Sequence, residues 1–391
     1  MHVRVGLLWH SLASGNLGVC ALTLAQLGLL DEIAEEVGAE IDVVMFVNPV
    51  ARPIMPLPFD SERVRVGETV PLSARSLSAG LPRIAGAFRR CDLLIDIAEG
   101  DSFTDVYGAR RYVKQVASKL ISLATRTPLV LAPQTIGPFR SRATRALPAL
   151  ILRRAEAVFA RDRPSAAFAA QLAPSTVVQI AADLAVRLPY ERGSRDDGPV
   201  RVGLNVSGLL YNLRAEKDRF GLRTSYARLV DRLIAEFVSR EACELHLVPH
   251  VAVGEAGDED AATCAALAER YEGVQLAPAF SDPRDAKSYI ARMDFFIGAR
   301  MHACIAAYSA GVPLLPLAYT RKATGLFESL DYPVVGDLTS ADENELFQLA
   351  LRTFEDRRSL VPALERGNAV AADRLHLYRQ CLTELVRALG R

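Results

Sequence analysis

The chain has 391 residues, of which 50% are hydrophobic and 24% are charged, and this balance excludes a largely disordered protein. Lys and Arg together number 46 and Asp and Glu 46, so the formal net charge is zero and the bulk positive charge of a non-specific nucleic-acid binder is missing. The six cysteines lie far apart and form no CxxC pair, so neither a zinc ribbon nor a disulfide framework is expected.

The N-terminal segment has the features of a strand and not of a targeting signal. Residues Val3–Leu8 are short, carry a charge and run into a polar Gly/Ser loop. The best apolar candidate, Ala146–Ala160, is interrupted by Arg153 and Arg154, so we expect no apolar run of the roughly 18 residues that a membrane helix needs. These features predict a soluble, reduced, cytoplasmic protein without a transmembrane segment.

Short β-branched runs alternate with Ala/Leu/Arg-rich helical patterns in the first half of the chain. Strands are predicted at Val3–Leu8, Ile41–Phe46, Asp92–Ile97, Leu129–Ala132 and Ala157–Ala160, and helices at Cys20–Val37, Arg83–Arg90, Tyr112–Thr125 and Leu147–Ala155. This alternation indicates a parallel sheet covered by helices on both faces.

A linker and a second series of the same kind follow. Pro189–Pro199 combines two prolines, two glycines and a charge cluster, which is typical of a domain boundary. Beyond it, strands are predicted at Arg201–Val206, Glu244–Val248, Val274–Leu276, Asp294–Ile297 and Leu314–Leu317, and helices at Tyr226–Arg240, Asp260–Tyr271, Ala286–Arg292, Met301–Ala310 and Glu343–Phe354, with a largely helical end.

The predicted fold class is therefore α/β, with two Rossmann-like domains whose parallel sheets face a central cleft. The expected domains are residues 1–190 and 199–370, with a C-terminal helix at 371–391 that packs back on the first domain. Ligands of such folds bind outside the carboxyl ends of the strands, so polar residues that directly follow strands are the candidates for function.

The strongest candidates are Arg300 and His302, in the sequence GARMH that follows a predicted strand and begins an Ala-rich helix. A helix start favours anions, an arginine adds a cation that can bind in a bidentate way, and a histidine adds a proton donor near neutral pH. The alternative for the histidine is a place in the core. Further candidates in this half, each after a predicted strand, are Asn205, Ser207, His250 and Lys322.

Acidic and hydroxyl side chains cluster in the segment Asp96–Asp105, DIAEGDSFTD, after a buried strand. Carboxylates in this place bind sugar hydroxyls or act as a general base, and Asp101 is the main candidate. The alternative is helix capping by Asp101, Ser102 or Thr104. No ligand spacing demands magnesium, so no metal is expected.

Three further segments of the first half follow predicted strands. The glycines of SLASGNLG, residues 11–18, let the backbone approach an anion or a sugar, or only close a turn, and the missing GxGxxG pattern disfavours dinucleotide binding. Gln134 belongs to a predicted wall of the site. Arg161 either binds a carboxylate or phosphate or pairs with Asp162 or Asp183.

These segments together resemble the polysaccharide pyruvyl transferase family. The resemblance covers most of the chain and rests on SLASGNLG, DLLIDIAEGDSFTDVYG, PQTIGPF, FARDRPSA, VGLNVSG and, most specifically, GARMHACIAAYSAGVPLLPLAYTRK. It implies a GT-B-like architecture and transfer of pyruvate from phosphoenolpyruvate to the hydroxyls of a saccharide or glycoconjugate, usually as a cyclic ketal. Phosphoenolpyruvate is then a substrate, and no cofactor is expected.

The resemblance also suggests roles for residues. Arg300 and His302 match the family's donor-binding and catalytic pair, and Arg161 is a weaker match to a second anion-binding arginine. We expect His302 to act as the acid and Asp101 as the base, with Glu99 as the alternative base. The expected donor-binding residues are Arg300, Arg161, Asn205, Ser207, His250 and Lys322, and the expected acceptor-binding residues are Asn16, Glu99, Ser102 and Gln134.

This sequence departs from the family at two places, both in the half expected to bind the acceptor. Val19 and Cys20 stand where the family often has an acidic pair, and Glu99-Gly100 replaces a glycine pair. Two alternatives remain: a nucleotide-sugar glycosyltransferase of the same architecture, and a non-catalytic saccharide-binding relative. The sequence makes no prediction of the acceptor's identity or of the oligomeric state.

Overall fold

The computed structural model describes the chain except for residues 50–55, 101, 194–197, 214–219, 252–258 and 391. Its internal contacts divide the chain into two compact units. Unit 1 comprises Met1–Ser14, Leu22–Leu184 and Ala371–Arg391, and unit 2 comprises Gly15–Ala21 and Ala185–Val370. Compared with the expected ranges, the turn Gly15–Ala21 belongs to unit 2, and the boundary lies before the predicted linker.

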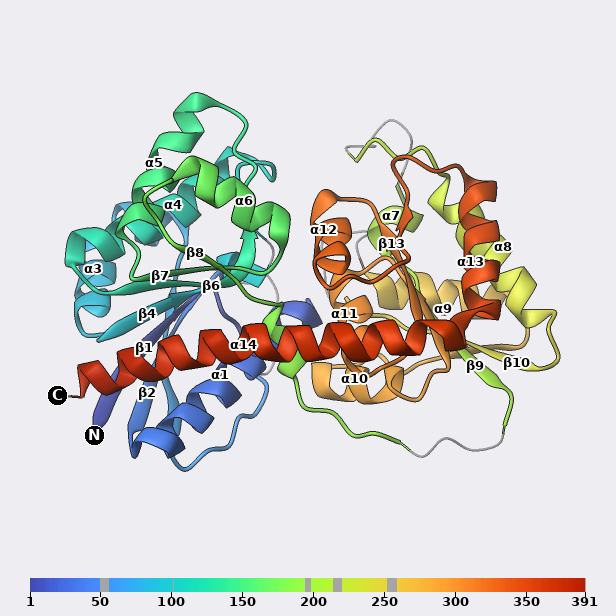
Figure 1. Cartoon of the computed structure of the whole chain (residues 1–391), viewed down its shortest axis with the longest axis horizontal. Helices are drawn as coiled ribbons and strands as arrows, with labels where there is room; N and C mark the ends of the chain where they lie inside the picture. Colours follow the sequence, from blue (N-terminus) through green and yellow to red (C-terminus); the bar gives the residue numbers. More distant parts are fainter. Residues whose placement is uncertain (50–55, 101, 194–197, 214–219, 252–258, 391) are drawn as a thin grey trace. The chain divides into compact units, whose positions relative to one another are not determined.

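Unit 1 is built on a parallel sheet with the strand order β3-β2-β1-β4-β6-β7-β8, to which β5 adds beside β6 (Figure 1). With β5 set aside, this is the 3-2-1-4-5-6 order of Rossmann folds, extended by one strand. The strands are β1 (His2–Leu8), β2 (Glu40–Val47), β3 (Val64–Pro71), β4 (Leu93–Asp96), β5 (Ser102–Phe103), β6 (Leu129–Ile136), β7 (Ala157–Ala160) and β8 (Val178–Ile180).

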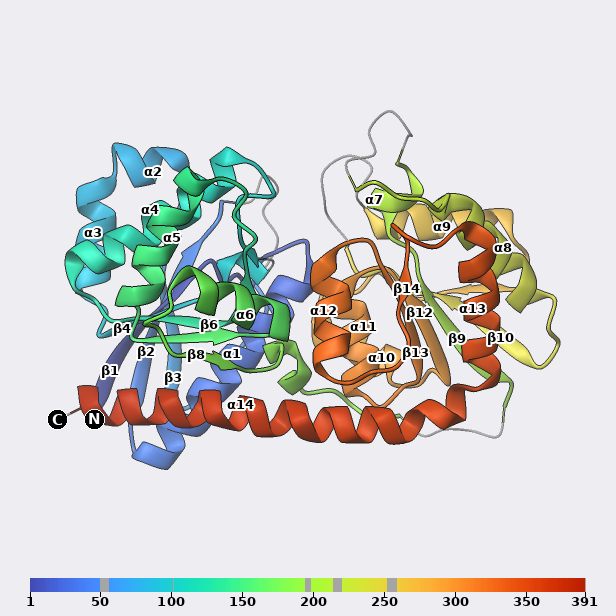
Figure 2. The same ribbon diagram turned by 45° about the horizontal axis from the view of Figure 1, so that its top comes forward.

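Helices cover both faces of this sheet, as parallel sheets require. Figures 1 and 2 show α3, α4 and α5 on one face and α1 with the end of α14 on the other. The helices of unit 1 are α1 (Leu17–Val37), α2 (Ala74–Ser78), α3 (Leu81–Arg89), α4 (Ala109–Thr125), α5 (Arg142–Arg154), α6 (Arg163–Leu172) and the last part of α14 (Val361–Leu389), with a 3-10 turn at Ala98–Gly100.

Unit 2 repeats the plan with the strand order β11-β10-β9-β12-β13-β14, which is the Rossmann order without an extension. Its strands are β9 (Val200–Asn205), β10 (Cys243–Leu247), β11 (Val274–Leu276), β12 (Phe295–Gly298), β13 (Leu314–Ala318) and β14 (Gly336–Asp337). Its helices are α7 (Gly208–Tyr211), α8 (Tyr226–Val238), α9 (Asp260–Arg270), α10 (Pro283–Ile290), α11 (Met301–Ser309), α12 (Arg321–Ser329) and α13 (Glu343–Glu355), followed by a 3-10 turn at Arg357–Leu360 and the start of α14. The predicted fold class, α/β with two Rossmann-like parallel sheets, is confirmed.

Each sheet has a hydrophobic core that explains why its strands are continuous apolar runs. Every residue of β4, β6, β12 and β13 is buried, because helices cover both faces. Helix α8 contributes a single apolar face, with Leu229, Leu233, Ile234 and Phe237 in the core of unit 2. These cores hold the strand ends in register, and the candidate residues follow those strand ends.

Helix α1 is a correction to the expectation that no apolar run reaches membrane-spanning length. Leu17–Val37 is long and apolar enough to cross a membrane by length and composition, and no other helix among the described residues meets that test. Within the protein, 83% of its apolar window is buried. The helix is apolar because it packs against the sheet, as a core helix does.

Candidate functional site

Two candidate residues of unit 2, Asn205 and Arg300, are in contact where the strand order of its sheet reverses, between β9 and β12. Asn205 is the last residue of β9, and Arg300 follows β12 and is the N-cap of α11. The Asn205 side chain is completely buried, accepts the Arg300 backbone N–H at 2.9 Å through Oδ1, and donates Nδ2 to the Val248 carbonyl at 2.9 Å. Ligands of Rossmann folds bind at this crossing point.

Arg300 does not present its guanidinium as an unpaired cation, because Asp260 holds one edge of it. The Arg300 Nε lies 3.1 and 3.3 Å from the two Asp260 carboxylate oxygens, and Nη2 lies 2.8 Å from Oδ1. The Asp260 side chain is completely buried, and that of Arg300 is 13% exposed. Asp260, the first residue of α9, was not predicted as a site residue from the sequence.

Two buried polar side chains beside Arg300 have no hydrogen-bond partner within the part of the chain that the structure describes. They are the Ser207 hydroxyl and both ring nitrogens of His250. Burial, with the nearby charges of His302 and Arg300, lowers the pKa of His250 to about 3, so its imidazole is neutral at pH 7. Leaving a buried polar group unpaired costs about 1–3 kcal/mol, and a bound ligand would supply the missing partners.

His302 lies in the first turn of α11, and its ring packs on the backbone of Gly18 in the first turn of α1. A Cβ placed on Gly18 would lie 2.9 Å from Cε1 of the His302 ring and closer still to its Nδ1. Real Cβ atoms do not approach so closely, so only glycine fits there while the ring keeps its place. Gly18, the last residue of SLASGNLG, and His302 of GARMH are therefore in contact within unit 2.

Lys322 lies in the first turn of α12, which follows β13 of the same sheet. Burial lowers the pKa of its ammonium group to about 8. Lys322 therefore lies at the carboxyl end of the sheet's strands, as expected, and its ammonium group is partly shielded from water.

In unit 1, Glu99 projects from a backbone stretch in the left-handed region. The φ angles of Ala98, Glu99 and Gly100 are 48°, 64° and 71°. The Glu99 carboxylate accepts the Asn48 Nδ2 at 2.5 Å and lies 3.6 Å from the Arg111 Nε. Asp101, expected as the general base, lies outside the described residues.

Beneath this turn, the last residue of β4, Asp96, forms a completely buried ion pair with Lys119 of α4, at 2.9 Å. Gln134 of β6 donates Nε2 to the Asp96 carbonyl at 2.8 Å and to its Oδ1 at 3.3 Å. Ser102, in β5, is buried and pairs with Thr135 of β6. Gln134 and Ser102 therefore belong to the buried support of the Glu99 turn.

Arg161 and Asn16 lie in other surroundings than expected. Arg161, in unit 1, is 1% exposed, pairs with Asp183 at 2.9 Å and donates Nε to the Thr135 hydroxyl at 2.9 Å, so the structural pairing weighed for it from the sequence is present. Asn16 belongs to unit 2, where it bridges to Val251, and its Oδ1 accepts the Gly18 N–H at 3.0 Å. The first strand–helix turn thus serves the unit expected to bind the donor.

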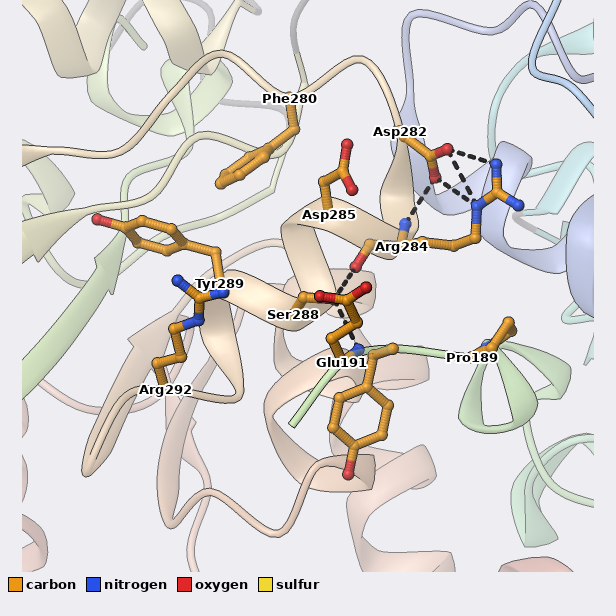
Figure 3. Close-up of a pocket in the computed structure, with 10 residues that line it drawn as sticks. Pro189, Glu191, Phe280, Asp282, Arg284, Asp285, Ser288, Tyr289 and Arg292 are labelled. Carbon is orange, nitrogen blue, oxygen red and sulfur yellow. Dashed lines mark hydrogen bonds and ion pairs between the residues drawn. The ribbon is translucent and has the colours of Figure 1, made fainter. Parts of the chain in front are cut away.

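A separate pocket of about 500 Å³ in unit 2 contains none of the predicted residues (Figure 3). Its lining consists of Pro189, Tyr190, Glu191, Phe280, Asp282, Arg284, Asp285, Ser288, Tyr289 and Arg292. Arg284 is held there by Asp282, the N-cap of α10. Among the described residues, no group of three or more His, Cys, Asp or Glu side chains could hold a metal ion.

Solved structures share this architecture over nearly the whole chain. The UDP-GlcNAc 2-epimerase of Neisseria meningitidis, solved with UDP-GlcNAc, aligns with a TM-score of 0.57 at 10% identity, covering 99% of each chain. MnaA of S. aureus, solved with UDP, gives 0.57 at 12% identity over 94% of this chain and 92% of its own. The spinosyn rhamnosyltransferase SpnG gives 0.54 at 12% identity over 99% and 100%. The fold is GT-B.

The family model for polysaccharide pyruvyl transferases matches residues 55–321, more than half of the chain. The chain belongs to this family, as the motifs suggested, and is thus a transferase related to polysaccharide biosynthesis. No curated protein matches it.

Proposed function

We propose that the protein transfers the pyruvyl group of phosphoenolpyruvate to hydroxyls of a saccharide or glycoconjugate, forms a ketal and releases phosphate. Membership of the family supports pyruvyl transfer in general. The observation that supports an anionic donor is the group around Arg300 in unit 2, where the α11 N-terminus, a half-buried His302 and the unpartnered Ser207 and His250 side chains lie together. Carboxylate and phosphate groups suit such a combination.

The proposed reaction adds a proton to C3 of the donor, which makes C2 electrophilic. An acceptor hydroxyl then forms a bond to C2 and gives up its proton, the C2–O bond to phosphate breaks, and a second hydroxyl closes the ketal. His302 would deliver the proton to the methylene or to the departing phosphate. No electron transfer is involved, so the proposal includes no cofactor.

The acceptor is assigned to unit 1 in this proposal. The Glu99 carboxylate, which contacts Asn48 and Arg111 on the turn after β4, would accept hydrogen bonds from sugar hydroxyls. Asp101, two residues on in the sequence, is proposed as the base that takes the hydroxyl proton. We place this chemistry in the cytoplasm.

One observation favours a second candidate, a nucleotide-sugar glycosyltransferase. Several solved relatives of the fold contain UDP, among them Anabaena HepE with UDP and glucose, which aligns with a TM-score of 0.52 at 14% identity over 99% of this chain and 100% of its own. In that case the anion site of unit 2 would bind a diphosphate.

A donor screen separates these candidates. The purified protein is incubated with a panel of saccharide acceptors and either phosphoenolpyruvate or nucleotide sugars, and release of phosphate or of nucleoside diphosphate is measured. We expect phosphate release with phosphoenolpyruvate and no turnover of nucleotide sugars. The opposite pattern would establish the glycosyltransferase, and saccharide binding without turnover of either donor would indicate a non-catalytic relative.

A further inference from the structure

Asp260 has an unusually complete set of hydrogen-bond donors for a buried carboxylate. Its Oδ1 accepts the Gly208 N–H at 2.9 Å, and its Oδ2 accepts the N–H groups of His250 and Val251 at 3.2 and 3.1 Å. The Nε and Nη2 groups of Arg300 complete the set. A buried carboxylate keeps its charge only when it is paired and hydrogen-bonded in this way.

These donors come from three different strand ends. Gly208 follows β9, His250 and Val251 follow β10, and Arg300 follows β12, and these three strands are neighbours in the sheet. Asp260 itself begins α9. A single carboxylate therefore fixes the loops on both sides of the point where the strand order reverses.

The carboxylate also fixes the backbone at Ser207 and His250, whose side chains have no hydrogen-bond partner among the described residues. It binds the N–H of His250 itself, and it binds the N–H of Gly208, the residue after Ser207. Through Arg300 it holds the N-cap of the helix that carries His302. An ion pair that served stability alone would not need to contact the three loops that carry Ser207, His250 and Arg300.

We propose that Asp260 is the positioning residue of the anion site in unit 2. It holds the guanidinium of Arg300 in one plane and sets the Ser207 and His250 side chains around the bound donor. The identity of the donor in this inference rests on the proposed function. The binding of an anion at this site does not.

The test is a double-mutant cycle of Asp260→Asn and Arg300→Ala, read by calorimetric titration of the full chain with phosphoenolpyruvate and, separately, with UDP. Each single variant should raise the donor Kd by about 10- to 100-fold, the range for losing a charge-assisted hydrogen bond. Because Asp260 acts largely through Arg300, the double variant should bind at least tenfold more tightly than the product of the two single effects predicts.

Steady-state phosphate release adds a second measurement: Asp260→Asn should raise the KM for the donor more than it lowers kcat. Asp282→Asn is the matched control, since Asp282, like Asp260, is an aspartate at the start of a helix of unit 2 and pairs with an arginine, Arg284. It should lower the melting temperature and leave the donor Kd unchanged. If Asp260→Asn does not fold, Asp260→Glu keeps the charge, displaces it by one methylene, and should raise the Kd at least fivefold.

The outcomes distinguish this inference from the proposed function. Binding of UDP but not phosphoenolpyruvate would remove the proposed function, and the cycle measured with UDP would still test Asp260. Wild-type affinity in Asp260→Asn, or single effects that simply multiply, would overturn the positioning role. Failure of the wild-type protein to bind either anion would overturn both.

Discussion

At the scale of single residues, Arg300 and His302 are only two positions apart but have different surroundings. The guanidinium of Arg300 is held by hydrogen bonds to the Asp260 carboxylate, whereas the ring of His302 packs against the backbone of Gly18. A guanidinium held by an ion pair suits a group that binds an anion. A ring held by close packing suits a group whose position relative to the reacting atoms matters.

His302→Asn should therefore reduce turnover far more than donor binding. Asparagine keeps much of the size and one donor group but cannot deliver a proton, and general acid catalysis is typically worth about 10²- to 10⁴-fold. We expect kcat for phosphate release to fall by that factor while the phosphoenolpyruvate Kd stays within about threefold. His246→Asn is the control: His246 contacts Tyr289 at 2.8 Å elsewhere in unit 2 and should leave kcat unchanged. Turnover near the wild-type level in His302→Asn would assign His302 a structural role.

Gly18→Ala tests the contact that holds the ring. The added methyl group overlaps the imidazole, so the ring must move by an ångström or more, and a displacement of this size at a catalytic group costs about 100-fold. Gly28→Ala is a matched control in the same helix, because nothing lies within 4 Å of a Cβ at Gly28.

The control should raise the free energy of unfolding by about 0.4–1 kcal/mol, since alanine favours the helix, and should not alter kcat. Both variants are compared by urea unfolding and by phosphate release. Equal effects on kcat in the two variants would show that Gly18 has no special relation to His302.

Residues such as Asn205, Ser207 and Arg300 could be predicted because they follow apolar strands, and strand ends of a parallel sheet meet at one edge. Asp260 could not, because it does not directly follow a predicted strand and its sequence context is that of an ordinary helix start. The contact of Gly18 with His302 could not be predicted either, since it joins positions far apart in the sequence. The glycines there were expected to approach a ligand or only to close a turn.

At the scale of elements, the turn after β4 has two successive non-glycine residues in the left-handed region. Ala98 and Glu99 adopt positive φ angles that non-glycine residues rarely take. The turn is held by the Asp96 Oδ1, which accepts the Ala98 N–H at 3.1 Å, and by the Gln115 Nε2, which donates to the Ala98 carbonyl at 3.2 Å. Strain that is held this firmly indicates that the position of the Glu99 side chain matters.

Glu99→Gly should leave stability within about 1 kcal/mol of the wild type, because relief of the left-handed strain offsets the greater freedom of the unfolded chain. Losing the carboxylate should change the acceptor KM by about tenfold or more and leave the donor Kd unchanged, since donor binding is assigned to unit 2. Arg126→Gly is the control, because Arg126 also has a left-handed φ of 60°, at the end of α4, and is exposed. This variant should change neither the acceptor KM nor the donor Kd. A large change in donor affinity in Glu99→Gly would show that this turn contacts the donor.

Elements with a buried apolar pattern were predicted within a few residues, as for α8, α11 and β13, because burial on one or both faces leaves a clear period in the sequence. The missed strands β3, β5, β8 and β14 are edge or short strands. In β3, an edge strand, only two of the residues are fully buried, and the segment contains a glycine and charged residues. Its sequence therefore resembles a loop.

At the scale of the whole molecule, the chain crosses from one Rossmann-like sheet to the other near residue 185, and Lys287 fixes the start of the second unit. The buried Lys287 ammonium donates to the carbonyls of Val186 and Leu188 at 3.0 and 2.8 Å and lies 4.9 Å from the Tyr190 ring centroid. The predicted boundary at Pro189–Pro199 begins directly after Leu188, because proline and glycine mark where regular structure stops. The contact that holds Val186 and Leu188 could not be predicted, because it comes from a lysine about one hundred residues further along the chain.

Lys287 should make the stability of the protein depend on pH above neutrality. Burial lowers the pKa of its ammonium to about 7 from the ordinary value of 10.5, so between these values the unfolded chain binds a proton that the folded chain releases. Stability from this group therefore rises as the pH increases from about 7 to about 10, and the cost of keeping the charge buried is fully present below pH 7. Urea unfolding of the wild type and of Lys287→Met at pH 7, 8 and 9 measures the difference: the free energies of the two proteins should diverge in favour of the wild type as the pH rises. Parallel curves would mean that Lys287 stays charged in the folded protein, held by the two carbonyls and the tyrosine ring.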